Sequence, residues 1–123
     1  AVLRGQIDLL FEDGAGRWRL VDYKSDRVST DQVARHAEGY RLQLLVYALA
    51  AWRFHGVAPA DARLYFLRPG IAHELALSES VLTDASRRLE QLTGKLIAAR
   101  RSGRFDRNAG EVCAFCPYRD LCR

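Results

Sequence analysis

An alternating pattern around a glycine-rich turn most constrains how this chain can fold. Residues 3–11 alternate between polar and apolar side chains, and one face of this stretch carries Ile7, Leu9 and Phe11. The residues that follow, Asp13-Gly14-Ala15-Gly16, favour a tight turn, and residues 17–24 resume as a strand. The pattern predicts a β-hairpin with a three-residue loop at Gly14-Ala15-Gly16.

A long helical pattern follows the hairpin. It begins at Thr30 or Asp31 and continues to His55, with apolar and aromatic residues recurring on one stripe. Gly39 is a point at which the helix can break, and Gly56 is a plausible stop. We therefore expect one long helix, interrupted near its first third.

Two more strands and a second long helix are expected after this helix. The expected elements are the strands Pro59–Arg68 and Ile71–Leu77 and a helix from Ser78 or Ser80 to Gly103. Pro69-Gly70 is a strong turn signal between the two strands. This order of elements predicts an α/β fold, a mixed sheet flanked by helices.

The size of the chain limits it to one hydrophobic core. With 123 residues, of which 49% are apolar, we expect a single domain or part of one. Within 1–123 we expect a core of sheet and helices over 1–103 and a cysteine segment over 104–123. The sequence has no Met and opens on a strand-like pattern, so we expect the N-terminal part of the domain to be missing. It has no apolar run of about 20 residues and no signal peptide, so we expect a cytoplasmic protein without membrane contact.

Two carboxylates and a lysine are the candidate reactive groups of the hairpin. Asp22 and Lys24 lie two residues apart in the second strand, so their side chains share one face. A three-residue loop would place Asp8 directly opposite Asp22. Facing carboxylates repel unless a cation lies between them, and hard oxygen ligands suit Mg²⁺ or Mn²⁺. The alternative is a cross-strand ion pair on a solvated sheet face.

Three short motifs carry a family resemblance. They are Gly5-Gln6-Ile7-Asp8, Leu20-Val21-Asp22-Tyr23-Lys24-Ser25 and Gln43-Leu44-Leu45-Val46-Tyr47. In order and separation they resemble the GxxD, DYK and QxxxY motifs of RecB-like and AddA-like nucleases in the PD-(D/E)XK superfamily. The resemblance implies a restriction-endonuclease-like core and a metal-dependent DNA nuclease.

The resemblance also implies a role for each matching residue. It implies that Asp8 and Asp22 are metal ligands with the Tyr23 carbonyl, that Lys24 is the catalytic lysine, and that Gln43 and Tyr47 line the site. Residues four apart share a helix face, which suits the last two, although Tyr47 is equally a residue type of helix cores. The family carries a further acidic residue or His on a helix before the GxxD strand. This sequence begins too late to contain it, so we expect the fragment alone to have weak or no activity.

Three cysteines gather near the end of the chain. Cys113, Cys116 and Cys122 form a Cys-x2-Cys-x5-Cys pattern, and three thiolates suit zinc or an iron-sulfur cluster. Both normally take four protein ligands, so the fourth must come from elsewhere. The string resembles the C-terminal end of the iron-sulfur branch of the same nucleases, which implies a four-iron four-sulfur cluster completed by an upstream Cys outside this chain. Unligated cysteines are the alternative.

The net charge of +4 is compatible with a polyanionic partner such as DNA, although a solvated basic face would give the same charge.

The resemblance favours an exonuclease module that acts with a helicase motor, on the same polypeptide or in the same complex, in processing double-strand breaks for DNA repair. A free-standing CRISPR-associated exonuclease and a non-catalytic DNA-binding scaffold module are the alternatives. We do not expect His36, His55 or His73 to be metal ligands.

Overall fold

The computed structural model describes residues 2–122, and the chain divides into two compact units, residues 1–90 and 91–123. The elements in chain order are β1 (Leu9–Glu12), β2 (Trp18–Lys24), η1 (Thr30–Gln32), α1 (Val33–Glu38), α2 (Arg41–His55), β3 (Asp61–Phe66), β4 (Ile71–Ala76), α3 (Glu79–Ser102) and η2 (Glu111–Phe115). The boundary between the units falls inside α3. Whether the two units form one domain stays a prediction.

The predicted hairpin is present, with the predicted register. β1 pairs antiparallel with β2, and Leu10 lies opposite Leu20. The Asp13 N–H donates to the Arg17 carbonyl at 2.9 Å, which closes a three-residue loop. Gly16 in that loop has φ +75°, a conformation that glycine adopts without steric cost.

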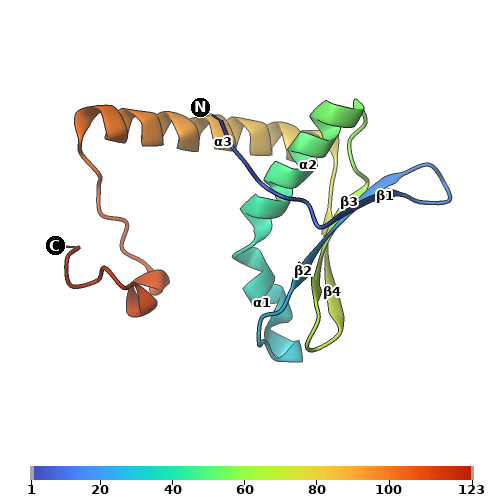
Figure 1. The fold of residues 1–123 in the computed structure, drawn as a ribbon, viewed down its shortest axis with the longest axis horizontal. Helices are drawn as coiled ribbons and strands as arrows, with labels where there is room; N and C mark the ends of the chain where they lie inside the picture. Colours follow the sequence, from blue (N-terminus) through green and yellow to red (C-terminus); the bar gives the residue numbers. More distant parts are fainter. Residues whose placement is uncertain (1, 123) are drawn as a thin grey trace. The chain divides into compact units, whose positions relative to one another are not determined.

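The four strands form one mixed sheet in the order β1-β2-β3-β4 (Figure 1). β2 and β3 are parallel, and the other two pairs are antiparallel. A parallel pair needs a long crossover, and η1, α1 and α2 supply it. The expected mixed sheet with flanking helices is therefore confirmed.

Helices α1 and α2 cover one face of the sheet (Figure 1). The main core joins side chains of β2 and β3 to those of α1 and α2, and its fully or nearly fully buried members are Leu20, Val33, Ala37, Leu44, Ala62, Leu64 and Phe66. On β2 the residues that face this core are Leu20, Asp22 and Lys24, because alternate residues share a face. The core face of β2 thus changes from apolar to polar toward its carboxyl end.

A second core lies between α2 and the first turns of α3. Its buried residues are Leu45, Ala48, Leu49, Leu82 and Ala85. The Val81 N–H donates to Ser78 Oγ at 3.2 Å, so Ser78, one of the two predicted starting positions, caps α3. Gly103 follows the last residue of α3 and, with φ +67°, ends the helix.

The predicted strand over 3–11 is wrong in its first half, because β1 begins only at Leu9. The pairing of β1 with β2 stops at Leu9 and Val21, and the Tyr23 N–H donates to the Asp8 side chain, so residues 2–8 are not part of the sheet ladder. They run instead as an extended segment in which Ile7 packs against the main core.

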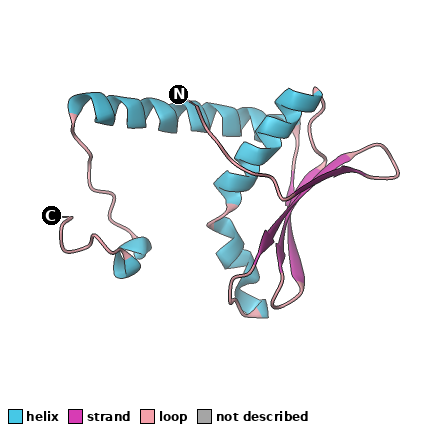
Figure 2. Ribbon diagram, viewed as in Figure 1, coloured by secondary structure: helices cyan, strands magenta, loops and turns pink. Residues whose placement is uncertain are grey.

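After α3, the described part of the second unit is loop and turn with the short helix η2, as Figure 2 shows. No helix of the described residues is long and apolar enough to cross a membrane.

Candidate active site at the end of β2

Asp22 and Lys24 make a close ion pair on the helix-covered face of the sheet. Lys24 Nζ lies 2.6 Å from Asp22 Oδ2, and both side chains are largely buried. A buried carboxylate is costly unless a cation or hydrogen-bond donors compensate it. Asp22 Oδ2 nevertheless accepts no hydrogen bond of good geometry, so the lysine compensates its charge without saturating the oxygen.

Helix α2 presents Gln43 and Tyr47 to this pair. Lys24 Nζ donates to Gln43 Oε1 at 3.0 Å, and Gln43 Nε2 donates to the Tyr47 hydroxyl at 2.8 Å. The two helical residues are four apart, which places them on one face. The structure thus joins four of the predicted site residues in one chain of polar contacts, from Asp22 to Tyr47.

The Asp8 side chain contacts β2 at Tyr23, the residue next to Asp22. It lies just before β1 and is exposed, and its Oδ2 accepts a hydrogen bond from the Tyr23 N–H at 2.9 Å. The observed register, continued by one residue, sets Asp8 opposite Asp22. That Asp8, Asp22 and the Tyr23 carbonyl share one metal ion stays a prediction.

The glycine of the first motif packs against the tyrosine of the third. A Cβ at Gly5 would lie 2.8 Å from a Tyr47 ring carbon, closer than two such atoms can approach. A cavity of about 280 Å³ opens beside this contact, and it is lined in part by Arg4, Tyr47 and Arg53. Gly5 therefore lets the extended segment pass directly over the helix that carries Gln43 and Tyr47.

A second polar network, which the sequence did not predict, adjoins Lys24. His36 Nε2 and the Tyr40 hydroxyl each lie 2.6 Å from Asp26 Oδ2. Hydrogen bonds from Tyr40 and His36 lower the pKa of Asp26, and the hydrogen bond to Asp26 with burial raises the pKa of Tyr40 to about 12. The spacing of Tyr40 and Gln43, three apart at the start of α2, was the available signal.

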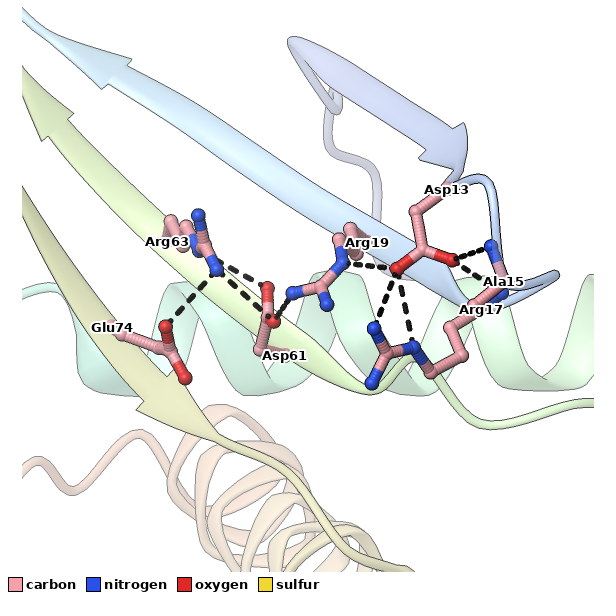
Figure 3. Close-up of polar contacts among 7 residues, drawn as sticks. All are labelled: Asp13, Ala15, Arg17, Arg19, Asp61, Arg63 and Glu74. Carbon is pink, nitrogen blue, oxygen red and sulfur yellow. Dashed lines mark hydrogen bonds and ion pairs between the residues drawn. The ribbon is translucent and has the colours of Figure 1, made fainter.

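The opposite face of the sheet carries a separate set of charges (Figure 3). Arg19 and Arg63 both contact the buried carboxylate of Asp61. Arg19 also pairs with Asp13 at 2.7 Å, and Arg63 with Glu74 at 3.1 Å. Every charge in this network has an opposite partner, and together they tie β2, β3 and β4. We assign it to the stability of the sheet.

The three cysteines do not form a ligand set in this structure. Cys113 and Cys116 are partly exposed, Cys122 is exposed, and all three are free thiols. No group of three or more His, Cys, Asp or Glu side chains in residues 2–122 is placed to hold a metal ion. That these three cysteines bind a cluster or zinc stays a prediction.

The whole sequence, residues 1–123, matches the family model described as the PD-(D/E)XK nuclease superfamily. The chain belongs to this superfamily. No curated protein matches the sequence. Membership implies a nuclease with DNA as its substrate, and the mixed sheet with flanking helices is consistent with the restriction-endonuclease-like core that the motifs predicted.

PD-(D/E)XK nucleases typically use divalent metal ions such as Mg²⁺, and the donors near Lys24 suit one. Asp22 offers a buried oxygen that accepts no hydrogen bond, and carboxylate oxygens are the ligands that Mg²⁺ prefers. Asp8 offers a second carboxylate on the adjoining strand. Two carboxylates alone leave most of the coordination shell to water and phosphate, which is usual for Mg²⁺.

Proposed function

We propose that this chain is a metal-dependent deoxyribonuclease that hydrolyses DNA phosphodiester bonds, with Asp8, Asp22 and Lys24 at its active centre. The observation that carries the proposal is the Lys24–Asp22 pair on the covered face of β2. A solvated surface pair would not be buried between sheet and helix. Nor would it need Gln43 as a further partner of the lysine.

The chain's own residues supply positioning and charge. Asp8, Asp22 and the Tyr23 carbonyl would hold Mg²⁺ or Mn²⁺, and that ion would activate water and polarise the scissile phosphate. Lys24 donates hydrogen bonds toward the negative charge that develops on the phosphate. Gln43 fixes the position of the lysine nitrogen, and Tyr47 in turn fixes Gln43.

We further propose that the chain is the exonuclease module of a helicase-nuclease that processes double-strand breaks. The succession of the GxxD, DYK and QxxxY motifs supports this assignment. A helicase motor and an iron-sulfur cluster, or zinc, on Cys113, Cys116 and Cys122 belong to the same proposal. Because these thiols do not converge in the described residues, a bound cluster would need rearrangement of the segment and a ligand from elsewhere.

The test is cleavage of DNA under single-turnover conditions in Mg²⁺ by the longer protein expected to contain this chain, carrying Asp22→Asn or Lys24→Ala. Each variant should lose roughly 10²–10³-fold or more in rate, the usual cost of removing a group that stabilises transition-state charge. Binding of duplex DNA, measured without metal, should change by no more than about twofold, because phosphate contacts elsewhere dominate affinity.

Asp84→Asn and Lys95→Ala are the matched controls. Asp84→Asn removes a negative charge, as Asp22→Asn does, and Lys95→Ala removes a positive charge, as Lys24→Ala does, but both positions are exposed on α3. Each control variant should cleave at close to the wild-type rate. Cleavage by Asp22→Asn at the wild-type rate would remove Asp22 from the active centre. If the control variants lost as much cleavage rate as Asp22→Asn and Lys24→Ala, the overall charge of the protein, and not the proposed active centre, would determine the rate.

A further inference from the structure

Tyr40 lies under the ammonium group of Lys24. Lys24 Nζ is 4.1 Å from the centroid of the Tyr40 ring, a distance at which the ring face attracts a cation. The same nitrogen contacts Asp22 Oδ2 and Gln43 Oε1. The lysine nitrogen is thus held by a carboxylate, an amide oxygen and an aromatic face.

The Tyr40 ring is itself fixed from several sides. Its hydroxyl donates to Asp26 Oδ2 at 2.6 Å, and the same oxygen lies 2.6 Å from His36 Nε2. The His36 ring meets the Tyr40 ring edge to face, with centroids 5.9 Å apart, and it meets the buried Phe66 in the same manner. These contacts leave the Tyr40 ring little freedom to turn away from Lys24.

A lysine needs such support more than most side chains. Its four-carbon stem has many rotamers, and a reacting geometry requires the nitrogen to stay in one place. Gln43 constrains the nitrogen on one side, but an ion pair with Asp22 alone is weakly directional because Asp22 Oδ2 accepts no well-formed hydrogen bond. The Tyr40 face supplies a surface that favours the charged ammonium and limits where it can lie.

We infer that Tyr40 is a positioning residue of the active centre, whose ring face holds the Lys24 ammonium against Asp22 while Asp26 and His36 hold the ring. The inference rests on the proposed nuclease function, since positioning matters only if Lys24 acts on DNA. Asp26 and His36 act through Tyr40 and are not catalytic residues.

The experiment compares Tyr40→Leu, which removes the ring, with Tyr40→Phe, which keeps it. Tyr40→Leu should lower kcat by on the order of tenfold with KM changed by less than about twofold, as expected for the loss of a half-buried cation–π contact. Tyr40→Phe should recover most of that loss because the ring face remains. Equal kcat values for Tyr40→Leu and the wild type would overturn the inference.

A spectroscopic measurement separates this inference from the proposed function. Because Lys24 Nζ lies 4.1 Å from the Tyr40 centroid, the NMR signals of the Lys24 ε-methylene group, recorded without metal or DNA, should show the ring-current shift of Tyr40. Tyr40→Leu should abolish that shift and Tyr40→Phe should keep it, with Tyr40→Met as the ring-free variant if Tyr40→Leu does not fold. A Lys24 signal unchanged in the ring-free variant overturns the positioning role. Wild-type cleavage by Lys24→Ala overturns the nuclease function instead, whatever the NMR signals show.

Discussion

Asp26 shows how one oxygen can organise several side chains. It accepts hydrogen bonds from His36 and Tyr40 on a single carboxylate oxygen, and these bonds lower the pKa of Asp26 below its ordinary value of 3.8. A carboxyl group whose pKa falls on folding stabilises the folded state when it is ionised. Its contribution to the free energy of unfolding is present above pH 3.8 and is lost as the pH falls through the folded-state pKa.

The Asp26→Asn variant tests this dependence. At pH 7 its free energy of unfolding should be lower than that of the wild type by about 1.5–3 kcal/mol, the range for hydrogen bonds to a charged group. The difference between the two proteins should shrink as the pH falls below 3.8, because the unfolded wild-type chain then binds a proton at Asp26 that the folded state, with its lower pKa, does not. In the same variant the Tyr40 pKa should fall from about 12 toward 10.

Urea denaturation at a series of pH values gives the first comparison, and ultraviolet titration of tyrosine gives the second. Ser25→Ala, at the exposed neighbouring position, serves as the control. A stability difference that is the same at pH 3 and pH 7 would mean that the charge of Asp26 contributes nothing.

The pairing of Asp22 with Lys24 was predictable from the sequence, but the surroundings of the pair were not. Asp22 and Lys24 could be assigned to one face because strand alternation depends only on spacing. The contact between Lys24 and the Tyr40 ring depends on how α2 crosses the sheet, which local spacing does not encode. The sequence therefore offered Tyr40 only as one of the aromatic residues in the helical pattern of residues 30–55, and His36 only as a residue not expected to bind a metal.

At the level of elements, glycines mark the boundaries that the sequence predicted most accurately. The expected helix of residues 30–55 divides into η1, α1 and α2, and the break falls at Gly39 and Tyr40. Gly56 ends α2 in the left-handed conformation with φ +75°, and its N–H donates to the Trp52 carbonyl at 2.8 Å. The start of β1 could not be predicted, because the alternation continues before Leu9, whereas the pairing stops at Leu9 and Val21 although β2 itself runs on to Lys24.

Two glycine-to-alanine substitutions should have opposite effects on stability. A Cβ at Gly56 or Gly94 would meet no atom within 4 Å, so only backbone conformation distinguishes the two sites. Gly56→Ala places a side chain in the left-handed region and should lower the free energy of unfolding by about 1 kcal/mol. Gly94→Ala lies inside α3 and should raise it by about 0.5–1 kcal/mol.

Thermal and urea denaturation of both variants check this prediction. Because both substitutions add the same methyl group without a steric conflict, each variant is the control for the other. Stabilisation by Gly56→Ala would show that α2 does not end in the left-handed turn. Destabilisation by Gly94→Ala would show that α3 is not a regular helix at that position.

At the scale of the whole molecule, the fold class followed from the order of elements, whereas the strand order did not. Strands and helices alternating in this sequence predict a mixed sheet with helices. The parallel pairing of β2 with β3 depends on the crossover through α1 and α2 and on the core that it buries. Pairing between segments so distant in sequence is set by tertiary packing, which one sequence does not display.

The net charge of +4 is the property of the whole molecule that bears most directly on DNA. Much of the excess lies late in the sequence, and the last turn of α3 carries Arg100 and Arg101, both exposed. An arginine that contacts a phosphate releases a condensed counterion when DNA binds, so affinity falls as salt rises. Each such contact adds about 0.9 to the steepness of log K against log salt concentration for duplex DNA.

We predict that the double variant Arg100→Gln, Arg101→Gln binds duplex DNA of any sequence more weakly. The slope of log K against log salt concentration should be shallower by roughly 2 for this variant than for the wild type. Arg87→Gln is the control, because Arg87 already pairs with Asp84 at 3.2 Å and has less to gain from a phosphate. Fluorescence anisotropy over a range of salt concentrations measures the slope for each protein. The cleavage rate at saturating enzyme should remain near that of the wild type, since these arginines hold DNA and do not act on the scissile bond. An unchanged slope in the double variant would show that the DNA lies elsewhere on the protein.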